Sequence, residues 1–430
     1  MTPKTEILIV GAGLSGLSAA YHLGKNKKVR IIEKENRPGG LAVTDNVNDF
    51  RFDKTGHLLH LKNPEMKKWI IDENFKKHIL LLHRISRIWS YGRYTRYPFQ
   101  SNTYGLPKAV AKECIDEFLK IQAHPLTKEV RTFADFIYHH FGKGFAKHFL
   151  IPYNKKIWGV DPKEMNVLWC KKFVPLPKIE DVLKGAKKNG GEELGYNVDF
   201  YYPKLGIGDF SNKIAEITQK KHEIEYNISL EKVDFRTQTA LLNSGEKIRY
   251  EYLISTAPLK ELSQYLDKPP VSFKNKANLL RFRSLNYLNI ALKKTAVFDF
   301  HWCYVPSPKV PFYRVGYYSN FSVSCAPKGQ SSLYVELTDR PFNKRILSQV
   351  IDYLKQMKII RNQSDILFID PQRIDYAYVI YDQNYPLIVP AIHQFLNQHN
   401  IYSVGRYGAW NYSSMEDALL MGREIAQKLN

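Results

Sequence analysis

The N-terminal end of the chain carries a glycine pattern that constrains the fold more than any other feature of the sequence. Four apolar residues at 7–10 lead into Gly11, Gly13 and Gly16, and a helical pattern follows at 17–23. A continuous apolar run is typical of a parallel strand that is buried on both faces. Gly11 permits a tight turn, Gly13 lets backbone amides approach a pyrophosphate at the helix N-terminus, and Gly16 lets helix and strand pack closely. These residues predict a dinucleotide-binding βαβ unit.

A second strand is predicted at 29–32, and it ends on Glu33. An acidic side chain at the end of this strand accepts hydrogen bonds from the ribose of a bound dinucleotide. Because strand, glycines, helix, second strand and acid follow in the expected order, the pattern is far more specific than an isolated glycine motif.

A basic residue and a glycine pair come shortly after the acid, namely Arg37, Gly39, Gly40 and then Leu41. This segment resembles the flavoprotein superfamily of amine oxidases and their relatives, in which the glycine pair and the arginine lie close to the FAD pyrophosphate. The resemblance implies that the cofactor is FAD rather than NAD. Arg-Pro-Gly-Gly is also good chemistry for a solvent-exposed turn, and that alternative stays open.

Composition and charge limit the function classes. The chain has 430 residues, a length typical of two or three subdomains that share one cofactor. The formal net charge of +21 favours anionic partners. The basic residues are scattered and no nucleic-acid motif accompanies them, so we expect no nucleic-acid partner.

The cysteines and the apolar runs bear on the compartment. The cysteines show no CxxC and no metal-ligand spacing, so we expect reduced thiols and no metal site. No apolar run approaches the ~18–20 residues of a membrane span. The first strand begins too close to the N-terminus for a signal peptide to precede it. We therefore expect a cytoplasmic protein without stable membrane insertion, and a homo-oligomer stays open.

Changes of pattern along the chain predict three subdomains. Residues 101–150 have apolar residues at helical spacing, and 283–380 contain the alternating runs of an antiparallel sheet. A late strand, a Gly-Arg turn and a final helix at 415–427 indicate a return to the first domain. We predict an α/β fold with a Rossmann-like FAD-binding domain, a helical subdomain and an antiparallel β-sheet subdomain. The predicted FAD-binding domain comprises 1–90, 204–265 and 395–430, the helical, nucleotide-binding subdomain 91–203, and the sheet subdomain 266–394.

Two segments, 94–102 and 151–160, combine aromatic residues with an amide side chain in a composition typical of neither a helix nor a loop. A flat ring can stack on Tyr or Phe while Gln or Asn reads its edge. Both segments are candidates for a nucleotide pocket. Ordinary core packing is the alternative for each single aromatic residue.

Together these segments resemble the UDP-galactopyranose mutase family, and its eukaryotic branch more than the bacterial one. The resemblance runs from residue 6 to the C-terminus. Its most specific parts are Tyr97-Pro98-Phe99-Gln100, Pro152-Tyr153-Asn154 with Trp158, Pro311-Phe312-Tyr313-Arg314, and Gly405-Arg406-Tyr407-Gly408 with Trp410 and Tyr412.

The resemblance implies an isomerase that uses reduced FAD. In that family flavin N5 attacks the anomeric carbon of a UDP-sugar, UDP leaves, and the sugar recloses with the other ring size before UDP returns. The implied reaction interconverts UDP-galactopyranose and UDP-galactofuranose, for the biosynthesis of galactofuranose-containing polysaccharide. NAD(P)H is the implied reductant of FAD. The sequence leaves open which sugar is used.

The same resemblance implies site residues. For the cofactor, the backbone of His57 is expected near flavin N5, Arg84 and Arg406 beside the isoalloxazine, and Met415 at the start of the final helix. The residues expected around the uridine and the sugar are Tyr97, Phe99, Gln100, Asn154, Trp158 and Asn197. Those expected on the diphosphate are Tyr304, Arg314, Tyr385 and Tyr412, which together with His57 form the predicted catalytic set.

The sequence also departs from the family pattern. The family uses two arginines on the diphosphate, and the first would fall at Phe173 here. The neighbouring cation, Lys172, lacks the bidentate fork of Arg. Leu205-Gly206 replaces a glycine pair, and His60 stands where the family prefers an aromatic residue under the flavin. Two alternatives therefore stay open: a mutase-like FAD oxidoreductase acting on a different substrate, and a non-catalytic FAD-binding protein.

Overall fold

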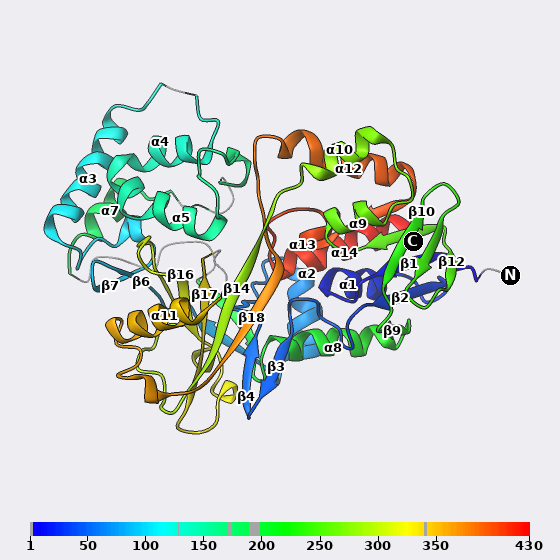
Figure 1. The fold of residues 1–430 in the computed structure, drawn as a ribbon, viewed down its shortest axis with the longest axis horizontal. Coiled ribbons are helices and arrows are strands. Elements are labelled where there is room, and N and C mark those ends of the chain that lie inside the picture. The colour runs from blue at the N-terminus through cyan, green and yellow to red at the C-terminus, as the bar shows by residue number, and fades with distance from the viewer. Residues whose placement is uncertain (1–2, 128, 171–173, 175, 189–197, 339–341) are drawn as a thin grey trace.

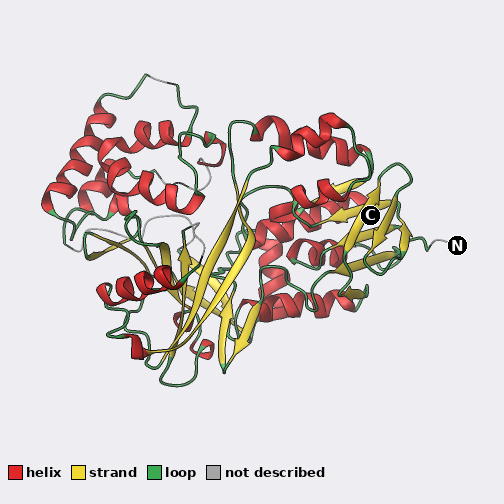
Figure 2. Ribbon diagram, viewed as in Figure 1, coloured by secondary structure: helices red, strands yellow, loops and turns green. Residues whose placement is uncertain are grey.

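The computed structural model describes residues 3–127, 129–170, 174, 176–188, 198–338 and 342–430. The predicted α/β fold class is confirmed. A parallel sheet with its helices lies at one end of the molecule, a large and mostly antiparallel sheet crosses its middle, and a helical layer lies at the other end (Figure 1, Figure 2).

Five short strands form the parallel sheet, in the order β19-β13-β1-β2-β9. All four residues of the central strand β1 are buried, as its apolar run predicts. Segments that are far apart in the sequence therefore share one sheet. The strands are β1 (Ile7–Val10), β2 (Val29–Glu33), β9 (Ile224–Tyr226), β13 (Tyr252–Ser255) and β19 (Ile401–Ser403).

The C-terminal helix α14 (Met415–Leu429) packs against α1 (Leu14–His22), and α8 (Ile207–Gln219) packs on α1 as well (Figure 1). A Cβ on Gly422 would lie 2.2 Å from the carbonyl oxygen of Ser15, so the close approach of α14 to α1 requires glycine there. The chain thus returns to the βαβ unit at its end. The predicted subdomain borders themselves stay predictions.

A smaller three-stranded sheet and three further helices lie near the parallel sheet (Figure 1). They are β10 (Leu230–Asp234), β11 (Thr239–Leu242), β12 (Lys247–Arg249), α9 (Leu259–Tyr265), α10 (Val271–Asn278) and α12 (Tyr385–Gln398). Among the described residues, no helix is long and apolar enough to cross a membrane.

The central sheet has the strand order β18-β14-β17-β16-β15-β6-β7. The alternation at 283–380 predicted most of its strands, but β6 and β7 come from a much earlier part of the chain, and β6 pairs with β15 in parallel. The strands are β6 (Ser86–Ser90), β7 (Arg93–Arg96), β14 (Phe282–Leu292), β15 (Trp302–Tyr304), β16 (Phe312–Tyr317), β17 (Ser331–Leu337) and β18 (Ile366–Val379).

The helical layer contains α3 (Lys108–Ala123), α4 (Phe133–Phe145), η3 (Ala146–Leu150), α5 (Ile151–Trp158) and α7 (Ile179–Lys184). The interpretation of 151–160 as neither helix nor loop was wrong, because most of it forms α5. Pro152 stands in the first turn of that helix, where its missing N–H costs no intrahelical hydrogen bond. Gly159 ends α5 with a φ of 70°.

The remaining elements connect these layers. They are β3 (Thr44–Val47) and β4 (Phe50–Asp53), α2 (Pro64–Lys67), η1 (Lys68–Phe75), β5 (Ile79–His83) paired with β8 (Asp199–Pro203), η2 (Phe99–Ser101), η4 (Val167–Trp169), η5 (Tyr318–Asn320), η6 (Val323–Cys325), α11 (Lys344–Gln356), η7 (Gln363–Asp365) and α13 (Gly405–Gly408). The expected Gly-Arg turn near the C-terminus is this last short helix.

Candidate active site

The glycine loop between β1 and α1 has the geometry of a dinucleotide cradle. Gly11 has a φ of +98°, and a Cβ there would lie 2.2 Å from Thr256 Oγ1. A Cβ on Gly16 would lie 2.0 Å from the carbonyl oxygen of Gly11. Gly13 is the N-cap of α1 and has no side chain to cap it, so the amides of the first turn face outward toward any bound anion.

The second glycine pair lies directly beside this loop. Gly39 forms a β-bridge with Gly13, and its N–H donates to the carbonyl oxygen of Ala12 at 2.9 Å. Gly39 is buried and has a φ of +113°. Gly40, in contrast, is exposed and lies in a turn, so burial against the first glycine loop holds for Gly39 alone. The Cα of Gly40 would lie 4.0 Å from a Cβ on Gly13, so the two glycine turns face each other.

The predicted ribose acid is bound to the same loop. Glu33 Oε2 accepts from the Ala12 N–H at 2.7 Å, and Oε1 accepts from the Glu35 N–H at 2.9 Å. Burial raises the pKa of Glu33, against the effect of these two amide hydrogen bonds. Each oxygen keeps a further lone pair that a ribose hydroxyl can use.

Two of the predicted cofactor residues have partners within the fold. Arg37 forms an ion pair with Asp45 on β3 and donates to the carbonyl oxygen of Thr44 at 3.3 Å. Leu41 packs on the hydrophobic core next to the glycine pair. Their contribution to cofactor binding stays a prediction.

His57 follows the β3–β4 hairpin, and its loop contacts the central sheet. Gly56 contacts the central sheet so closely that a Cβ there would lie 2.4 Å from Tyr334 Oη. Burial, together with the charges of Arg406 and Arg314, lowers the pKa of His57 to about 4. The His57 imidazole is therefore neutral at pH 7 and adds no charge to the site.

Arg406 is placed by the short helix that follows β19. A Cβ on Gly405 would lie 2.5 Å from Ser15 Oγ, so Arg406 stands next to the start of α1. Its guanidinium donates to the carbonyl oxygen of Ser413 at 2.6 Å and lies 4.5 Å from the ring centroid of Tyr412. These contacts bring Arg406 and Tyr412 to the His57 end of the cradle.

Two buried polar atoms near Arg406 bear on whether a cofactor fits at this site. Asn411 Oδ1 and Ser413 Oγ are buried and have no hydrogen-bond partner within the described part of the chain. Both line a cavity of about 190 Å³ that reaches the first turns of α14. A polar group of a bound cofactor could satisfy buried polar atoms of this kind. Met415, the first residue of α14, lies beside them.

The central sheet supplies an ion pair at the site. Arg314 on β16 and Glu336 on β17 are cross-strand partners, and the guanidinium binds the carboxylate in a bidentate manner at 2.8 and 2.6 Å. Glu336 is fully buried, whereas the Arg314 side chain keeps 20% of its surface exposed. Burial lowers the pKa of Arg314, but the charge of the Glu336 carboxylate raises it by more. The pKa of Arg314 is therefore above its ordinary value.

One row of side chains crosses the sheet through this pair. The register places Tyr304 on β15 opposite Arg314, and Tyr287 on β14 opposite Glu336. Residues directly opposite each other in neighbouring strands share one face of a sheet. Tyr304, Arg314, Glu336 and Tyr287 therefore line the same face. Glu336 was not predicted as a site residue. In the sequence it stands out only as the single acidic residue within the apolar strand 333–337.

The helical layer adds aromatic side chains over this row. The ring centroid of Tyr97 lies 4.9 Å from that of Tyr304, and that of Tyr153 on α5 lies 5.4 Å from it. The guanidinium of Arg84 lies 5.2 Å from the Tyr97 ring centroid. Trp158 on α5 contacts Tyr412 at 5.9 Å between ring centroids. All three layers of the fold thus meet at one aromatic and cationic site.

Other predicted residues have structural roles in this state of the protein. Phe99 is fully buried and stacks on Phe149 at 4.9 Å, so its place is the core rather than an open pocket. Asn154 Oδ1 accepts from Trp158 Nε1 at 3.1 Å, so Asn154 orients the indole ring. Tyr385 Oη donates to the carbonyl oxygen of Trp410 at 2.8 Å.

Some predictions for the site stay untested by this geometry. Gln100 is buried beside Phe99. His60 Nδ1–H donates to the carbonyl oxygen of Asp199 at 3.0 Å, and burial lowers the pKa of His60 to about 4. Asn197, Lys172 and Phe173 lie outside the described residues.

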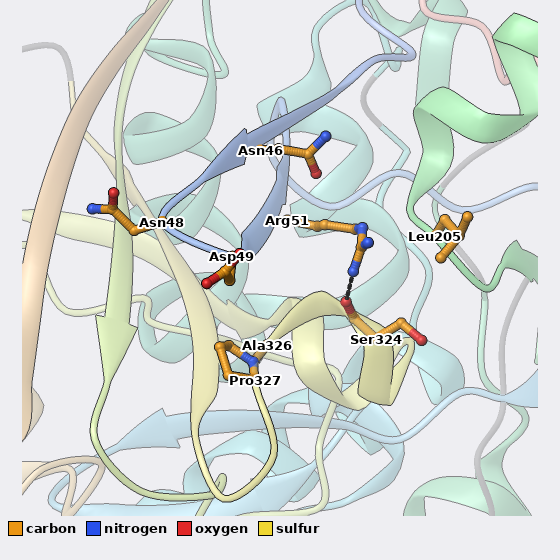
Figure 3. A pocket seen from close by; sticks show the side chains of 8 residues that line it. All are labelled: Asn46, Asn48, Asp49, Arg51, Leu205, Ser324, Ala326 and Pro327. Atoms are coloured by element: carbon orange, nitrogen blue, oxygen red, sulfur yellow. Dashed lines mark hydrogen bonds between the residues drawn. The ribbon is translucent and has the colours of Figure 1, made fainter.

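A larger cavity of about 590 Å³ lies elsewhere, between the β3–β4 hairpin and η6 (Figure 3). Arg51 reaches across it and donates to the carbonyl oxygen of Ser324 at 2.5 Å. None of the predicted site residues lines this cavity. It is therefore distinct from the glycine cradle and from the Arg314 row.

The site combines a glycine cradle on a parallel sheet, a second glycine pair beside it, and a group of cationic and aromatic side chains. This combination is typical of a dinucleotide-binding flavoprotein. The model of the flavin containing amine oxidoreductase family matches residues 14–430, which is nearly the whole chain. The chain belongs to this family. It is accordingly an enzyme of the flavin amine oxidoreductase class, and its cofactor is FAD.

Individual relatives are similar over different lengths. A crystal structure of reduced UDP-galactopyranose mutase superposes with a TM-score of 0.89 at 26% identity, over 99% of this chain and 93% of that one. Putrescine oxidase with bound putrescine superposes with a TM-score of 0.66 at 16% identity, over 100% and 99% of the two chains, which shows the fold alone. Bovine (Bos taurus) prenylcysteine oxidase 1 is 38% identical over 74 residues, a match that spans 16% of this chain and 14% of the bovine protein.

Proposed function

We propose that this flavoenzyme is a sugar-nucleotide mutase that interconverts the pyranose and furanose forms of a UDP-sugar, of the UDP-galactopyranose type. The observation that carries the proposal is the Arg314 row. It puts the partly exposed side chain of Arg314 and that of Tyr304 on one face of the central sheet. The similarity to reduced UDP-galactopyranose mutase over nearly the full length of both chains supports it.

The ion pair leaves Arg314 able to bind phosphate. Glu336 occupies the Nε–H and one N–H of Nη2. A guanidinium has five N–H donors, so the remaining ones can reach a diphosphate. Glu336 also compensates part of the positive charge, which favours release of UDP over trapping it.

The tyrosines complete the proposed diphosphate site. Burial raises the pKa of Tyr304 and of Tyr97, so both phenols stay neutral at pH 7, and we propose that Tyr304 donates to the diphosphate and Tyr97 to the uridine. Tyr412 is a further proposed donor, and Tyr385 is proposed there as well, where its single O–H would leave the carbonyl oxygen of Trp410 to donate to the diphosphate. Asn154, Trp158, Gln100 and Asn197 are the proposed contacts to the uridine and the sugar.

When bound and reduced, FAD supplies the nucleophile for the anomeric carbon. The protein supplies the orientation of the sugar and the binding of the leaving UDP. Neutral His57 lets its loop approach the flavin without placing a second charge there. We propose NAD(P)H as the reductant, and Lys172 as the second cation in place of the arginine that Phe173 replaces.

The test is a turnover assay under argon. The protein is reduced with dithionite, UDP-galactopyranose is added, and the furanose is sought by chromatography. We expect furanose from reduced protein and none from oxidised protein. Arg131→Ala, which removes an exposed arginine paired with the exposed Glu129, serves as the control for Arg314→Ala. A reduced, FAD-loaded protein that forms no furanose contradicts the proposal.

The second candidate is a mutase-like FAD oxidoreductase that acts on a different substrate. Two observations favour it: the local similarity to prenylcysteine oxidase and Phe173 in place of a diphosphate arginine. An oxidase consumes one electron acceptor per turnover, whereas a mutase consumes none. Oxygen consumption that accompanies product formation would therefore favour this candidate.

A further inference from the structure

One lysine ammonium lies inside the protein, between the helical layer and the central sheet. Lys156 on α5 is buried, with 7% of its surface exposed. Its Nζ donates to the carbonyl oxygens of Val305 at 2.8 Å, Ser307 at 2.8 Å and Phe312 at 2.5 Å. An ammonium carries three N–H donors, so these three carbonyls match its full capacity.

The carbonyls of Val305 and Ser307 belong to the loop that connects β15 and β16, and the carbonyl of Phe312 belongs to the first residue of β16. Val305 directly follows Tyr304, and Phe312 stands two residues before Arg314. Lys156 therefore binds both ends of the loop as well as its middle. Tyr304 and Arg314, two of the residues that we place on the diphosphate, flank this loop on either side.

The lysine is itself held in place from the other side. Its carbonyl oxygen accepts a hydrogen bond from Arg283, a buried residue of β14. The same helix carries Tyr153 and Trp158, which contact Tyr304 and Tyr412 through their rings. Helix α5 is thus fixed to the sheet on both sides of the site.

Burying an ammonium is unfavourable unless its donors are satisfied. An apolar residue at position 156 would avoid that cost, but it would leave three carbonyls converging on a place with no donor. The loop conformation seen here therefore depends on a cation of this length at this position.

We propose that Lys156 is a positioning residue, which holds Tyr304 and Arg314 in the arrangement that binds the diphosphate. This inference rests on the proposed function, because only a ligand on these two residues makes their spacing matter. Lys156 acts through the loop and does not touch the substrate.

The test compares Lys156→Met with Lys155→Met. Lys155 is its neighbour on α5, with a side chain that is 50% exposed and paired with Asp161. We expect Lys156→Met to weaken UDP binding by about tenfold or more, while the FAD content, the flavin spectrum and the rate of reduction by NAD(P)H stay those of the wild type. Lys155→Met should keep wild-type affinity.

Hydrogen exchange of the ligand-free protein reports the loop itself. The N–H of Val305 donates to the carbonyl oxygen of Tyr313 at 2.9 Å. In Lys156→Met this amide should exchange about tenfold faster or more, with β1 and α14 unchanged. Lys156→Arg, which keeps the charge and several donors, should restore part of both the protection and the affinity.

A double variant separates positioning from general stability. If Lys156 acts through Arg314, Lys156→Met should weaken UDP binding far less in an Arg314→Ala background than in the wild type. A lower melting temperature with unchanged UDP affinity would overturn the inference. If Lys156→Met does not accumulate as folded flavoprotein, Lys156→Gln takes its place with the same expected direction.

The outcomes for the two proposals are distinguishable. A wild-type protein that binds no UDP overturns the proposed function, and with it the role of Lys156 toward the diphosphate. The exchange experiment needs no ligand. If the Val305 amide exchanges at the wild-type rate in Lys156→Met, Lys156 does not hold the loop, whatever the substrate is.

Discussion

Glu336→Gln is the most informative perturbation of the site, because it removes the charge that balances Arg314 and little else. Glu336 is fully buried and binds the guanidinium through both oxygens. Breaking a buried pair costs ~3–5 kcal/mol, since the remaining charge stays buried without compensation. With an unfolding entropy of about 2.1 cal/mol/K per residue, that is ~3–5 °C in melting temperature for a chain of this length.

The same variant should respond more strongly to UDP than the wild type. Arg314 without Glu336 keeps its full charge, so a diphosphate that contacts it replaces the lost partner. We expect UDP to bind Glu336→Gln more tightly by ~1–2 kcal/mol, and to recover a comparable part of the lost stability. Thermal melting with and without a fixed concentration of UDP measures both quantities.

Glu65→Gln is the matched control. Glu65 pairs with Arg423 at 2.7 Å, but its side chain is 78% exposed. Removing an exposed pair costs ~0–1 kcal/mol, and UDP should stabilise this variant as much as the wild type. If UDP shifts the melting temperature of Glu336→Gln by no more than that of the wild type, Arg314 does not face the diphosphate and the proposed site is wrong.

Four further predictions follow from the same geometry. Purified protein should be yellow and hold FAD without a covalent bond, and absence of flavin absorbance even after FAD is added would contradict the reading of the cradle. Arg314→Ala should weaken UDP binding by ~2 kcal/mol or more, measured by titration. Phe173→Arg should tighten UDP binding and steepen its salt dependence, since a charge pair is added; a flat response at two salt concentrations would place position 173 away from the diphosphate. Burial lowers the pKa of His57, His60 and His301 to about 4 each, so the unfolded chain binds protons that the folded one does not as the pH falls from about 6.5 to 4. Stability should decrease across that window, by ~1–3 kcal/mol for His301 alone, and urea midpoints at pH 7 and pH 5 will show it.

The cofactor cradle could be predicted because its determinants are local. The spacing of Gly11, Gly13 and Gly16, with an acid ending the next strand, reflects backbone geometry within one βαβ unit. The β-bridge between Gly13 and Gly39 joins two loops of the same unit. The C-terminal return was predicted from the order of strand and helix, and α14 packs on α1 as that order suggests.

The central sheet could be predicted only in part, because strand pairing between distant segments leaves no local signal. Alternation indicated the strands after residue 283, but nothing in 86–96 indicates a parallel contact with β15. Segment 151–160 was misread from its proline and aromatic composition, whereas Pro152 lies in the first turn of α5, where proline is tolerated. Aromatic residues near Phe99 could not be divided into core and pocket, since both environments select the same residue types.

The charges within the site explain how one arginine could serve where two are expected. A diphosphate that leaves a sugar and must then return has to be held without being trapped. In the proposed site Arg314 is balanced by Glu336, His57 is neutral because burial lowers its pKa to about 4, and Tyr304 is a neutral donor. Binding then depends on hydrogen bonds directed from a fixed sheet more than on net charge, since fixed donors in a dry site lose little on reorganisation. A site of this kind tolerates the loss of a second cation better than one that relies on charge alone, but it depends strongly on the positions of its donors. That dependence makes the loop between Tyr304 and Arg314, and the lysine that holds it, as important to the chemistry as the arginine itself.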